Sequence, residues 1–533
     1  MKRKQRLLAL LASSVILAGA AQAAPVNIST LPGVTDDSGA GTGPFRVTGN
    51  VTLSSGVDYA LDETIYVNGG TLTIQPGVMI VGSPGESLVV TRGSQIFAEG
   101  TAEQPIVFTS QADYDHIQDP VLNSAPTIGD NSEWGGVIIL GSAPINFYAA
   151  VSPFDGVTAN VNQGENAIEG IVGGDDNDFD GIGDLIEYGQ DNFKNADTDP
   201  LLTAGTPDPA DNSGVFKYVS IRFGGSTLSI DNEVNGLTMG GVGSGTTIEY
   251  VEVLNNSDDG FEWFGGTVNC SNLVSAFNED EDFDMDEGYS GKIQFAFALR
   301  YDDMDGDGNV ENGSELDGGN GSIKTGTPLT TAQIWNATYL GAGRVGTVSA
   351  LGNVFRMKDN FAGQFHNCVF DDFGGNLVRI DDANTAARVG NELLIQNSHW
   401  GRYNGAVAQG QTTAADALAN GTGNSNPTQK INPLLGGISR QPNGGLDPRP
   451  NTFSPLYGAS LSTPPAGLET VNYRGAFGST NWADGWTYLD SAGYFGNLAT
   501  VPPVTGGGEP PFVDSDNDGI DDALEVKIGR AHV

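Results

Sequence analysis

The amino-acid sequence predicts an all-β solenoid, a parallel β-helix in which strands and turns recur coil after coil. A repeat with a period of 22 spans residues 248–307 and aligns without gaps. Large apolar residues alternate with acids inside it, and alternation with a period of two is typical of a β-strand. A strand–turn–strand unit of this length buries its inner face only by stacking on copies of itself. The 76 glycines among 533 residues also fit a chain rich in turns.

The repeat carries two consecutive acids at the same place in each copy. Val251, Leu273 and Phe295 mark equivalent positions, and the acids begin at the seventh position after each of them. These acids are Asp258 with Asp259, Asp280 with Glu281, and Asp302 with Asp303. Equivalent residues of stacked coils lie about 4.8 Å apart, and two carboxylates at that distance repel by roughly 3 to 4 kcal/mol at an effective dielectric near 20. We expect this ladder to bind cations, to be protonated or to point into water.

The match continues beyond the acids in the first two copies. The pairs are Phe261 with Phe283, Glu262 with Asp284, Trp263 with Met285, and Gly266 with Gly288. Trp263 alternates with acids and is expected in the core. Upstream, Ile74 and Ile96 are separated by the same period and are expected to stack. Residues 217–223 precede residues 249–255 by 32, which predicts one coil plus an inserted loop of ten.

The first 23 residues have the pattern of a secretory signal peptide. Four basic residues within positions 2–6 precede an apolar run over residues 7–20, and Ala-Gln-Ala at 21–23 fits a cleavage site. We expect export to the extracellular space or the cell surface, with the periplasm as the alternative. No later stretch reaches the roughly 18 apolar residues of a membrane-spanning helix, so no transmembrane segment is expected.

The chain is strongly acidic. It has 24 basic and 66 acidic residues, and removal of residues 1–23 takes away four of the basic ones, leaving a formal charge of about −46. Such a chain is repelled by nucleic acid, and also by acidic polysaccharides unless a divalent cation bridges them. We therefore expect no nucleic-acid partner.

The domain organisation follows from composition. We assign residues 27–495 to the β-helix, 496–511 to a Pro/Gly-rich linker, 512–527 to a calcium-binding segment and 528–533 to an artefact of sequencing. Long insertions interrupt the stack at residues 113–131, 148–212, 308–331 and 385–432, and residues 412–419 in the last one are expected to be helical. Cys270 and Cys368 are three or four coils apart, beyond the reach of a disulfide, so two free, buried thiols are expected.

Three stretches follow the spacing of a twelve-residue calcium loop, which places carboxylates at alternate positions, a backbone carbonyl at position 7 and a bidentate glutamate at position 12. The C-terminal loop has the ligands Asp514, Asp516, Asp518, Ile520, Asp522 and Glu525. It resembles a thrombospondin type 3 or dockerin-like calcium repeat. A second complete set is Asp176, Asp178, Asp180, Ile182, Asp184 and Glu187. A third begins with Asp303, Asp305 and Asp307 but places Ser314 at position 12 and Glu315 at 13. We therefore expect Ca²⁺ as a cofactor.

Several coils resemble a known family. The stretches TLTIQPG at residues 71–77, AEGTAEQPIVFTS at 98–110, SEWGGVIILG at 132–141 and VFKYVSIRFGG at 215–225 are similar to coils of secreted proteins of the pectate-lyase-like superfamily. Together with the central repeat and later stretches, the resemblance covers most of residues 45–489. It implies a right-handed parallel β-helix and leaves the function open.

Two classes of function remain. The first is that of an exported, calcium-stabilised β-helix that binds a glycan or a cell-surface component without catalysis. The alternative is a polysaccharide-degrading enzyme, since the acidic turns resemble in spacing those of polygalacturonase-like hydrolases, with Asp258, Asp280 and Glu281 as candidate catalytic residues. The Gly-His-Gly turn of those hydrolases is absent from the sequence. A lyase would need a base, for which the candidates are Lys292, Arg300, Lys358 and Arg379.

Overall fold

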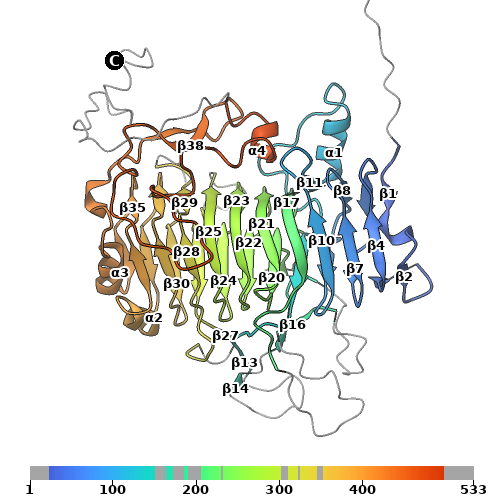
Figure 1. Cartoon of the computed structure of the whole chain (residues 1–533), viewed down its shortest axis with the longest axis horizontal. Helices are drawn as coiled ribbons and strands as arrows, with labels where there is room; N and C mark the ends of the chain where they lie inside the picture. The colour runs from blue at the N-terminus through green and yellow to red at the C-terminus, as the bar shows by residue number, and fades with distance from the viewer. Residues whose placement is uncertain are drawn as a thin grey trace, which may run out of the picture.

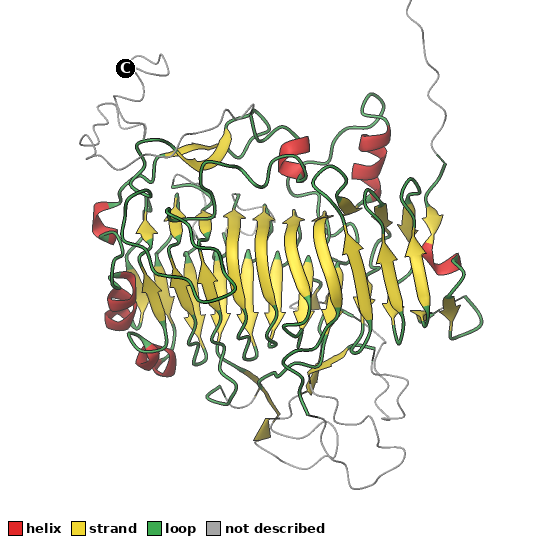
Figure 2. Ribbon diagram, viewed as in Figure 1, coloured by secondary structure: helices red, strands yellow, loops and turns green. Residues whose placement is uncertain are grey.

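A computed structural model describes residues 23–41, 43–149, 161–162, 165–171, 185–189, 206–229, 232–301, 310–321, 324–344 and 352–496. Within these residues the chain winds into a stack of short strands. The stack extends along the long axis of the molecule, from the N-terminal coils in blue to the later coils in orange (Figures 1 and 2). The predicted all-β solenoid is confirmed.

Two large sheets run the length of the stack, and neighbouring strands within them are parallel except for β2 and β3. In the described residues, sheet A consists of β1 (Val26–Asn27), β4 (Asn50–Leu53), β5 (Tyr59–Leu61), β7 (Thr71–Ile74), β8 (Met79–Gly82), β10 (Gln95–Glu99), β11 (Ile106–Thr109), β17 (Gly214–Arg222), β21 (Thr247–Leu254), β23 (Asn269–Ala276), β25 (Lys292–Leu299), β28 (Gln333–Trp335), β29 (Thr338–Leu340), β31 (Gln364–His366), β32 (Val369–Asp371), β34 (Leu394–Gln396) and β35 (His399–Trp400). Sheet B consists of β2 (Val34–Asp36), β3 (Phe45–Val47), β6 (Ile65–Val67), β9 (Leu88–Val90), β12 (Val137–Leu140), β20 (Leu237–Gly240), β22 (Phe261–Phe264), β24 (Phe283–Asp286), β26 (Ser314–Asp317), β30 (Phe355–Lys358), β33 (Val378–Ile380) and β36 (Ala408–Gly410).

Sheet A bends sharply along a line of residues with positive φ. In the long strands the bend falls at Tyr218, Tyr250, Asn272 and Phe295. In later coils the bend lies between two shorter strands of the same coil. The residues at the bend there are Asn336, Asn367 and Asn397. Asparagine adopts the left-handed conformation more readily than most residues, which suits it to this position.

The register confirms part of the predicted repeat and corrects the rest. Ile248 pairs with Cys270 and Phe261 with Phe283, as the predicted period requires, and the predicted offset of 32 between β17 and β21 is also confirmed. The third copy was misaligned. Leu273 pairs with Ala296 rather than with Phe295, because the turn between β24 and β25 is one residue longer than the turn between β22 and β23.

The predicted stacking of Ile74 on Ile96 is also wrong. Ile96 pairs with Leu72, and Ile74 pairs with Ala98. The coil that joins β7 to β10 is therefore slightly longer than the period of the central repeat. Turn length thus varies from coil to coil, while the alternation of inward and outward side chains is retained.

The interior of the stack is a continuous apolar core. Trp263 is completely buried and stacks on Phe261 and Tyr289, with ring centroids 6.0 and 5.4 Å apart. Both cysteines are buried and free, as predicted. Such extensive apolar burial is the main term that stabilises a solenoid of short strands.

The helices lie outside the two sheets (Figure 2). They are α1 (Gln111–Gln118), α2 (Ala383–Arg388), α3 (Thr412–Ala419) and α4 (Tyr488–Ser491). The position of α3 matches the predicted helix, and Ala415 and Leu418 join the core. Among the described residues there is no helix with the length and apolar character needed to span a membrane.

A C-terminal segment, residues 441–496, runs back over the outer face of sheet A. Gln294 donates to the carbonyl oxygen of Glu469 at 2.8 Å, and Asn367 donates to that of Ser462 at 3.0 Å. Side chains of sheet A such as Phe297 form a second apolar cluster with Phe477 and other residues of this segment. Sheet A is therefore covered on its outer side over several coils.

Candidate functional site

The outer face of sheet B carries acids on three neighbouring strands. Trp263, Met285 and Leu316 occupy the same register in β22, β24 and β26, and they point into the core. The residue before each of them faces the opposite way, because side chains alternate along a strand. These outward residues are Glu262, Asp284 and Glu315. Two residues after Asp284 and Glu315 in the same strands, Asp286 lies beside Asp317.

Further acids come from the turns that precede these strands. Carboxylate oxygens lie within 4.8 Å of one another in three groups of residues. The groups are Asp258, Asp259 and Asp280; Asp259, Glu262 and Asp284; and Asp280, Glu281 and Glu311. We use the name acid strip for Asp258, Asp259, Glu262, Asp280, Glu281, Asp284, Asp286, Glu311, Glu315 and Asp317.

Four residues of the acid strip are buried, namely Asp259, Glu262, Glu281 and Asp286, and the other six are partly exposed. Asp259 is only 5% exposed, and its Oδ1 atom has no hydrogen-bond partner. The Oδ1 atoms of Asp284 and Asp317 are also buried without a partner. Other oxygens do accept hydrogen bonds, for example Glu281 from the amide of Asn312 at 2.7 Å. Buried oxygens without donors are costly, and a cation that they coordinate removes that cost, so this residue set fits a metal ion.

Burial raises the pKa values of these acids, and their mutual repulsion adds to the effect. The pKa of Asp259 is raised well above its usual value, first by loss of solvent and then by Asp284 and Asp280. The same causes raise the pKa of Glu281, where Asp280 is the main charged neighbour. Burial and the charge of Glu287 raise the pKa of Asp286 to about 7. Without a cation, Asp286 is therefore partly protonated near neutral pH.

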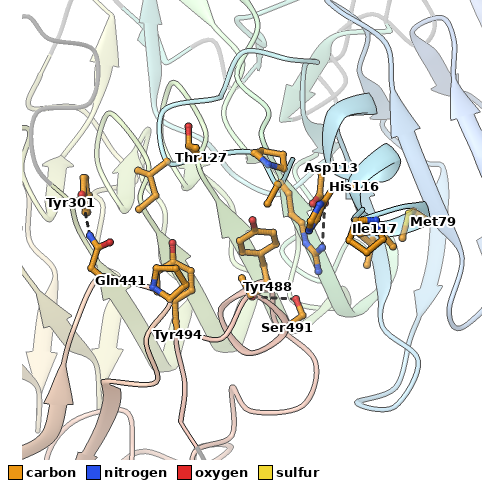
Figure 3. A pocket seen from close by; sticks show the side chains of 18 residues that line it. Met79, Asp113, His116, Ile117, Thr127, Tyr301, Gln441, Tyr488, Ser491 and Tyr494 are labelled. Atoms are coloured by element: carbon orange, nitrogen blue, oxygen red, sulfur yellow. Dashed lines mark hydrogen bonds and ion pairs between the residues drawn. The ribbon is translucent and has the colours of Figure 1, made fainter. Parts of the chain in front are cut away.

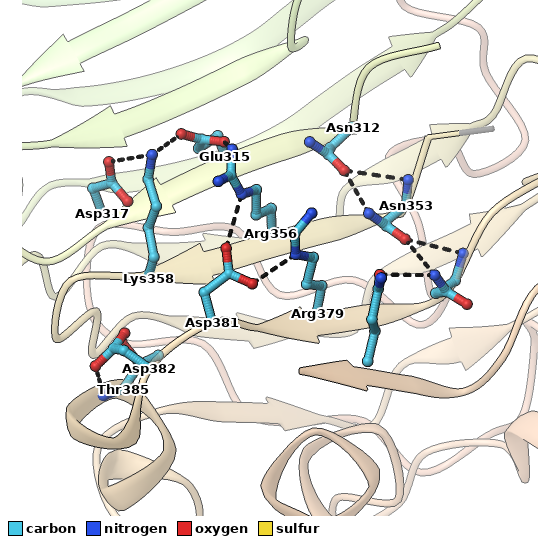
Figure 4. A network of polar contacts seen from close by, with 12 residues as sticks. Asn312, Glu315, Asp317, Asn353, Arg356, Lys358, Arg379, Asp381, Asp382 and Thr385 are labelled. Atoms are coloured by element: carbon cyan, nitrogen blue, oxygen red, sulfur yellow. Dashed lines mark hydrogen bonds and ion pairs between the residues drawn. The ribbon is translucent and has the colours of Figure 1, made fainter. Parts of the chain in front are cut away.

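Basic residues lie next to the acid strip on the following strands (Figure 4). Arg356 in β30 contacts Glu315 at 2.6 Å and Asp381 at 3.0 Å, and Lys358 contacts Glu315 and Asp317. Arg379 in β33 follows, with its Nε atom 2.6 Å from Asp381. The outer face of sheet B thus changes from negative to positive along the axis of the stack.

The charge state of Lys358 bears on its role as a base. Burial alone would lower the pKa of this amine, but Asp317 and Glu315 outweigh burial and raise it above the usual value. A lysine must lose its proton before it can act as a base. The carboxylate partners of Lys358 therefore oppose that role in the metal-free protein.

The three candidate catalytic residues lie in the acid strip. Asp258 and Asp280 share a group with Asp259, and Asp280 shares another with Glu281. One oxygen of each carboxylate lies within 4.8 Å of one oxygen of the others, which is closer than the roughly 6.5 to 9.5 Å between the carboxyl groups of an inverting glycosidase and near the roughly 5 to 5.5 Å of a retaining one. Distances this short suit ligands of one cation better than an acid and a base that hold water between them.

The other candidate bases are placed differently. Arg300 is buried in an ion pair with Asp282, with Nη1 to Oδ2 at 3.3 Å. Lys292 begins β25 in sheet A, whereas the acid strip lies on sheet B and its turns.

The predicted calcium loops fall almost entirely outside the described residues. These positions are Asp176, Asp178, Asp180, Ile182, Asp184, Asp303, Asp305, Asp307, Asp514, Asp516, Asp518, Ile520, Asp522 and Glu525, and Asp302 of the predicted acid ladder also lies outside the described residues. Glu187 is described; it begins β16 (Glu187–Gly189), and its carboxylate contacts Arg92 at 2.9 Å. The calcium loops thus remain predictions.

The candidate list from the sequence missed the strand acids. Glu262, Asp284 and Glu315 each hold the second place in the strand sequences FEWF, FDMD and SELD, and Arg356 holds it in FRMK. A charged residue between core residues in successive coils is the signal that could have identified them. The insertion between β24 and β26 conceals that signal, because it interrupts the regular period.

We expect the metal-free protein to lose stability as the pH rises from about 4 to about 7. Folding raises the pKa of Asp286 from 3.8 to about 7 and that of Asp282 to about 6. Between these pKa values the folded chain binds more protons than the unfolded chain. The free energy of unfolding is therefore unaffected below the unfolded pKa and has fallen by the full amount above the folded pKa. Asp36 and Asp381, whose pKa values are lowered, and His366 and His399, whose pKa values burial lowers to about 4, act in the opposite direction but are fewer than the acids whose values are raised. Urea unfolding in chelator at about pH 5 and about pH 8 checks this, and a higher midpoint at the higher pH contradicts it.

Comparison with known proteins gives a family and two distant structural likenesses. Residues 45–188 and 189–432 match the family model described as "Pectate-lyase like beta helix domain". No curated protein matches. Among solved structures, pectate lyase Pel9A is 15% identical, with a TM-score of 0.34 over 77% of this chain and 88% of that one. Endo-xylogalacturonan hydrolase from Aspergillus tubingensis is 12% identical, with a TM-score of 0.20 over 68% and 84%. Scores this low carry no argument about activity.

Proposed function

We propose that this chain, which belongs to the family of pectate-lyase-like beta helix domains, binds Ca²⁺ on the acid strip. Through that calcium it binds an acidic glycan, without cleaving it. One observation carries the proposal. Three overlapping groups of carboxylates lie beside a row of basic residues on one face of sheet B. The family by itself leaves the function open, since one fold hosts many activities.

The donor set supports calcium as the cation. All residues in the three groups are carboxylates, and Ca²⁺ prefers six to eight oxygen ligands in flexible arrangements. Asp259, whose Oδ1 atom has no partner, belongs to two of the groups. Calcium-binding modules of extracellular proteins commonly have dissociation constants of about 10⁻⁴ to 10⁻³ M, which suits the expected export of this chain.

The neighbouring charges support an acidic glycan as the ligand. The negative surface of the chain repels a polyanion unless a divalent cation bridges the two. Calcium on the acid strip would supply that bridge. Arg356 and Arg379 lie on the next strands in the same register, at a step of about 4.8 Å per coil. They can meet further carboxylates of an extended chain as guanidinium–carboxylate pairs.

Polysaccharide cleavage is the alternative, because a carboxyl group with a raised pKa can donate a proton. Glu281 is such a group, and general acids are tuned in this way. Binding is favoured because the candidate base Lys358 is held by Glu315 and Asp317. Release of reducing ends or unsaturated products from any acidic polysaccharide would establish cleavage and contradict our proposal.

The test is calorimetric titration of the full chain with polygalacturonate, in millimolar calcium and in chelator. We expect binding only with calcium. Asp284→Asn and Arg379→Gln should each weaken it about tenfold, equivalent to about 1.4 kcal/mol. Glu392→Gln is the matched control, because Glu392 is an exposed acid paired with Arg388 at the surface. Equal binding in chelator, or equal affinity of Asp284→Asn and the control, would contradict the proposal.

A further inference from the structure

A large cavity lies on the side of sheet A, away from the acid strip on sheet B. It has a volume of about 880 Å³ and opens between the loop that follows α1 and the C-terminal segment. Figure 3 shows residues of both parts facing one another across it. Its floor includes Met79, Val107 and Arg222 from β8, β11 and β17. Small-molecule sites commonly have volumes of about 300 to 1,000 Å³, so the size suits a small ligand.

The walls of the cavity are mostly apolar and aromatic. Ile117, Ile128 and Pro442 contribute aliphatic surface. Tyr488 and Tyr494 contribute rings, and their hydroxyl groups point into the space in Figure 3. Neither hydroxyl makes a hydrogen bond to another residue within the described part of the chain. A ligand that offers a donor or acceptor could therefore bond to two phenols without displacing a protein partner.

His116 offers a further polar atom. Its Nδ1 lies 2.9 Å from the carbonyl oxygen of Asn123. A carbonyl oxygen only accepts, so Nδ1 carries the proton, and in the neutral ring Nε2 is left as an acceptor. Thr127, Tyr301, Gln441 and Ser491 also line the cavity, so its polar groups include both donors and acceptors.

The charges at the floor of the cavity are already compensated. Arg222 Nη1 lies 3.4 Å from Asp113 Oδ2, and the two side chains are 6% and 1% exposed. The guanidinium also lies 5.0 Å from the centre of the Tyr488 ring, and its Nε donates to Ser220. A charged ligand would add an unpaired charge to a partly buried site whose own charges are already compensated, which is unfavourable.

We propose that this cavity binds an uncharged aromatic compound that carries a hydroxyl group, a neutral phenol. Flat apolar walls and tyrosine faces favour an aromatic ring. A free sugar is disfavoured, because much of its hydroxyl-covered surface would exchange water for the apolar and aromatic walls of the cavity. The site is separate from the acid strip, and the proposal stands independently of glycan binding.

The test uses three phenols of similar size and different charge: 4-ethylphenol, which is neutral, tyramine, which is a cation, and 4-hydroxyphenylacetate, which is an anion. Each is titrated into the full chain by calorimetry. We expect 4-ethylphenol to bind at least tenfold more tightly than either charged compound. Equal or tighter binding of a charged compound, or of methyl β-glucoside, would overturn the proposal, as would the absence of 4-ethylphenol binding.

Two variants locate the site. Ala492→Trp fills part of the cavity and should abolish 4-ethylphenol binding. Tyr494→Phe removes one hydroxyl with little change of shape and should weaken binding several-fold, which keeps the test valid if the tryptophan variant does not fold. Tyr457→Phe is the matched control, because Tyr457 lies outside the cavity and its hydroxyl is buried without a partner. Unchanged binding in Tyr494→Phe and in folded Ala492→Trp would place the ligand elsewhere and overturn the proposal.

Discussion

Arg300→Met is expected to lower the free energy of unfolding by about 3 to 5 kcal/mol, because it leaves a buried carboxylate without its counter-charge. Asp282 is completely buried, and Arg300 is 3% exposed. The guanidinium also donates to the carbonyl oxygens of Asp280 and Glu279, at 2.8 and 3.3 Å. The substitution therefore removes both an ion pair and the support of a turn that belongs to the acid strip.

Urea unfolding at neutral pH measures the loss. Glu392→Gln is the matched control, since exposed Glu392 pairs with Arg388 at the surface and such a pair contributes about 0.3 to 0.5 kcal/mol. Adding Asp282→Asn to Arg300→Met should restore part of the stability, because the unpaired charge is then absent. A loss no larger than that of the control would show that the buried pair contributes little.

Calcium is expected to stabilise the chain strongly. An ion that binds only the folded state adds RT ln(1 + [L]/Kd), about 2.7 kcal/mol for each site at a hundredfold excess over Kd. Bound calcium also offsets the repulsion within the acid strip. Thermal unfolding in excess chelator and in calcium measures the total, and equal melting temperatures would contradict calcium binding at any site.

Asp280→Ala separates the acid strip from the predicted calcium loops. Asp280 belongs to two of the three carboxylate groups. If the strip holds calcium, the variant loses a ligand, and its unfolding midpoint in saturating calcium falls below that of the parent. If the strip is only a solvated row of acids, the same change relieves repulsion and raises the midpoint by up to about 1 kcal/mol of stability. Asp416→Ala, at an exposed acid in α3, should leave the midpoint nearly unchanged.

The fold was predictable because stacking depends on a short-range pattern. The alternation around Phe261 and Phe283 specifies which side chains point inward, and a constant period specifies which coils are neighbours. The same reasoning failed at Phe295, because one extra turn residue shifts the register without changing the alternation. A sequence read by eye shows the alternation more clearly than the length of a turn.

The site was predictable only in part. Asp258 and Asp280 were found because they repeat within one regular stretch. Glu262 and Glu315 lie in β22 and β26, on either side of β24 in sheet B, and an insertion of unpredictable length separates them in sequence. The cavity beneath the C-terminal segment left no local pattern at all, because Arg222 and Tyr488, which meet at its floor, are far apart in the sequence.

The C-terminal segment has a consequence for the order in which the chain folds. Coils of the stack contact their neighbours in sequence and can add one after another as a nascent chain emerges. The outer face of sheet A behaves differently, because Phe297 and its neighbours are covered by residues that come much later in the chain, such as Phe477 and Trp486. Without these residues, an otherwise folded solenoid exposes the apolar outer face of sheet A. Chains truncated shortly before residue 441 should therefore bind chaperones more tightly than chains that include residues 441–496.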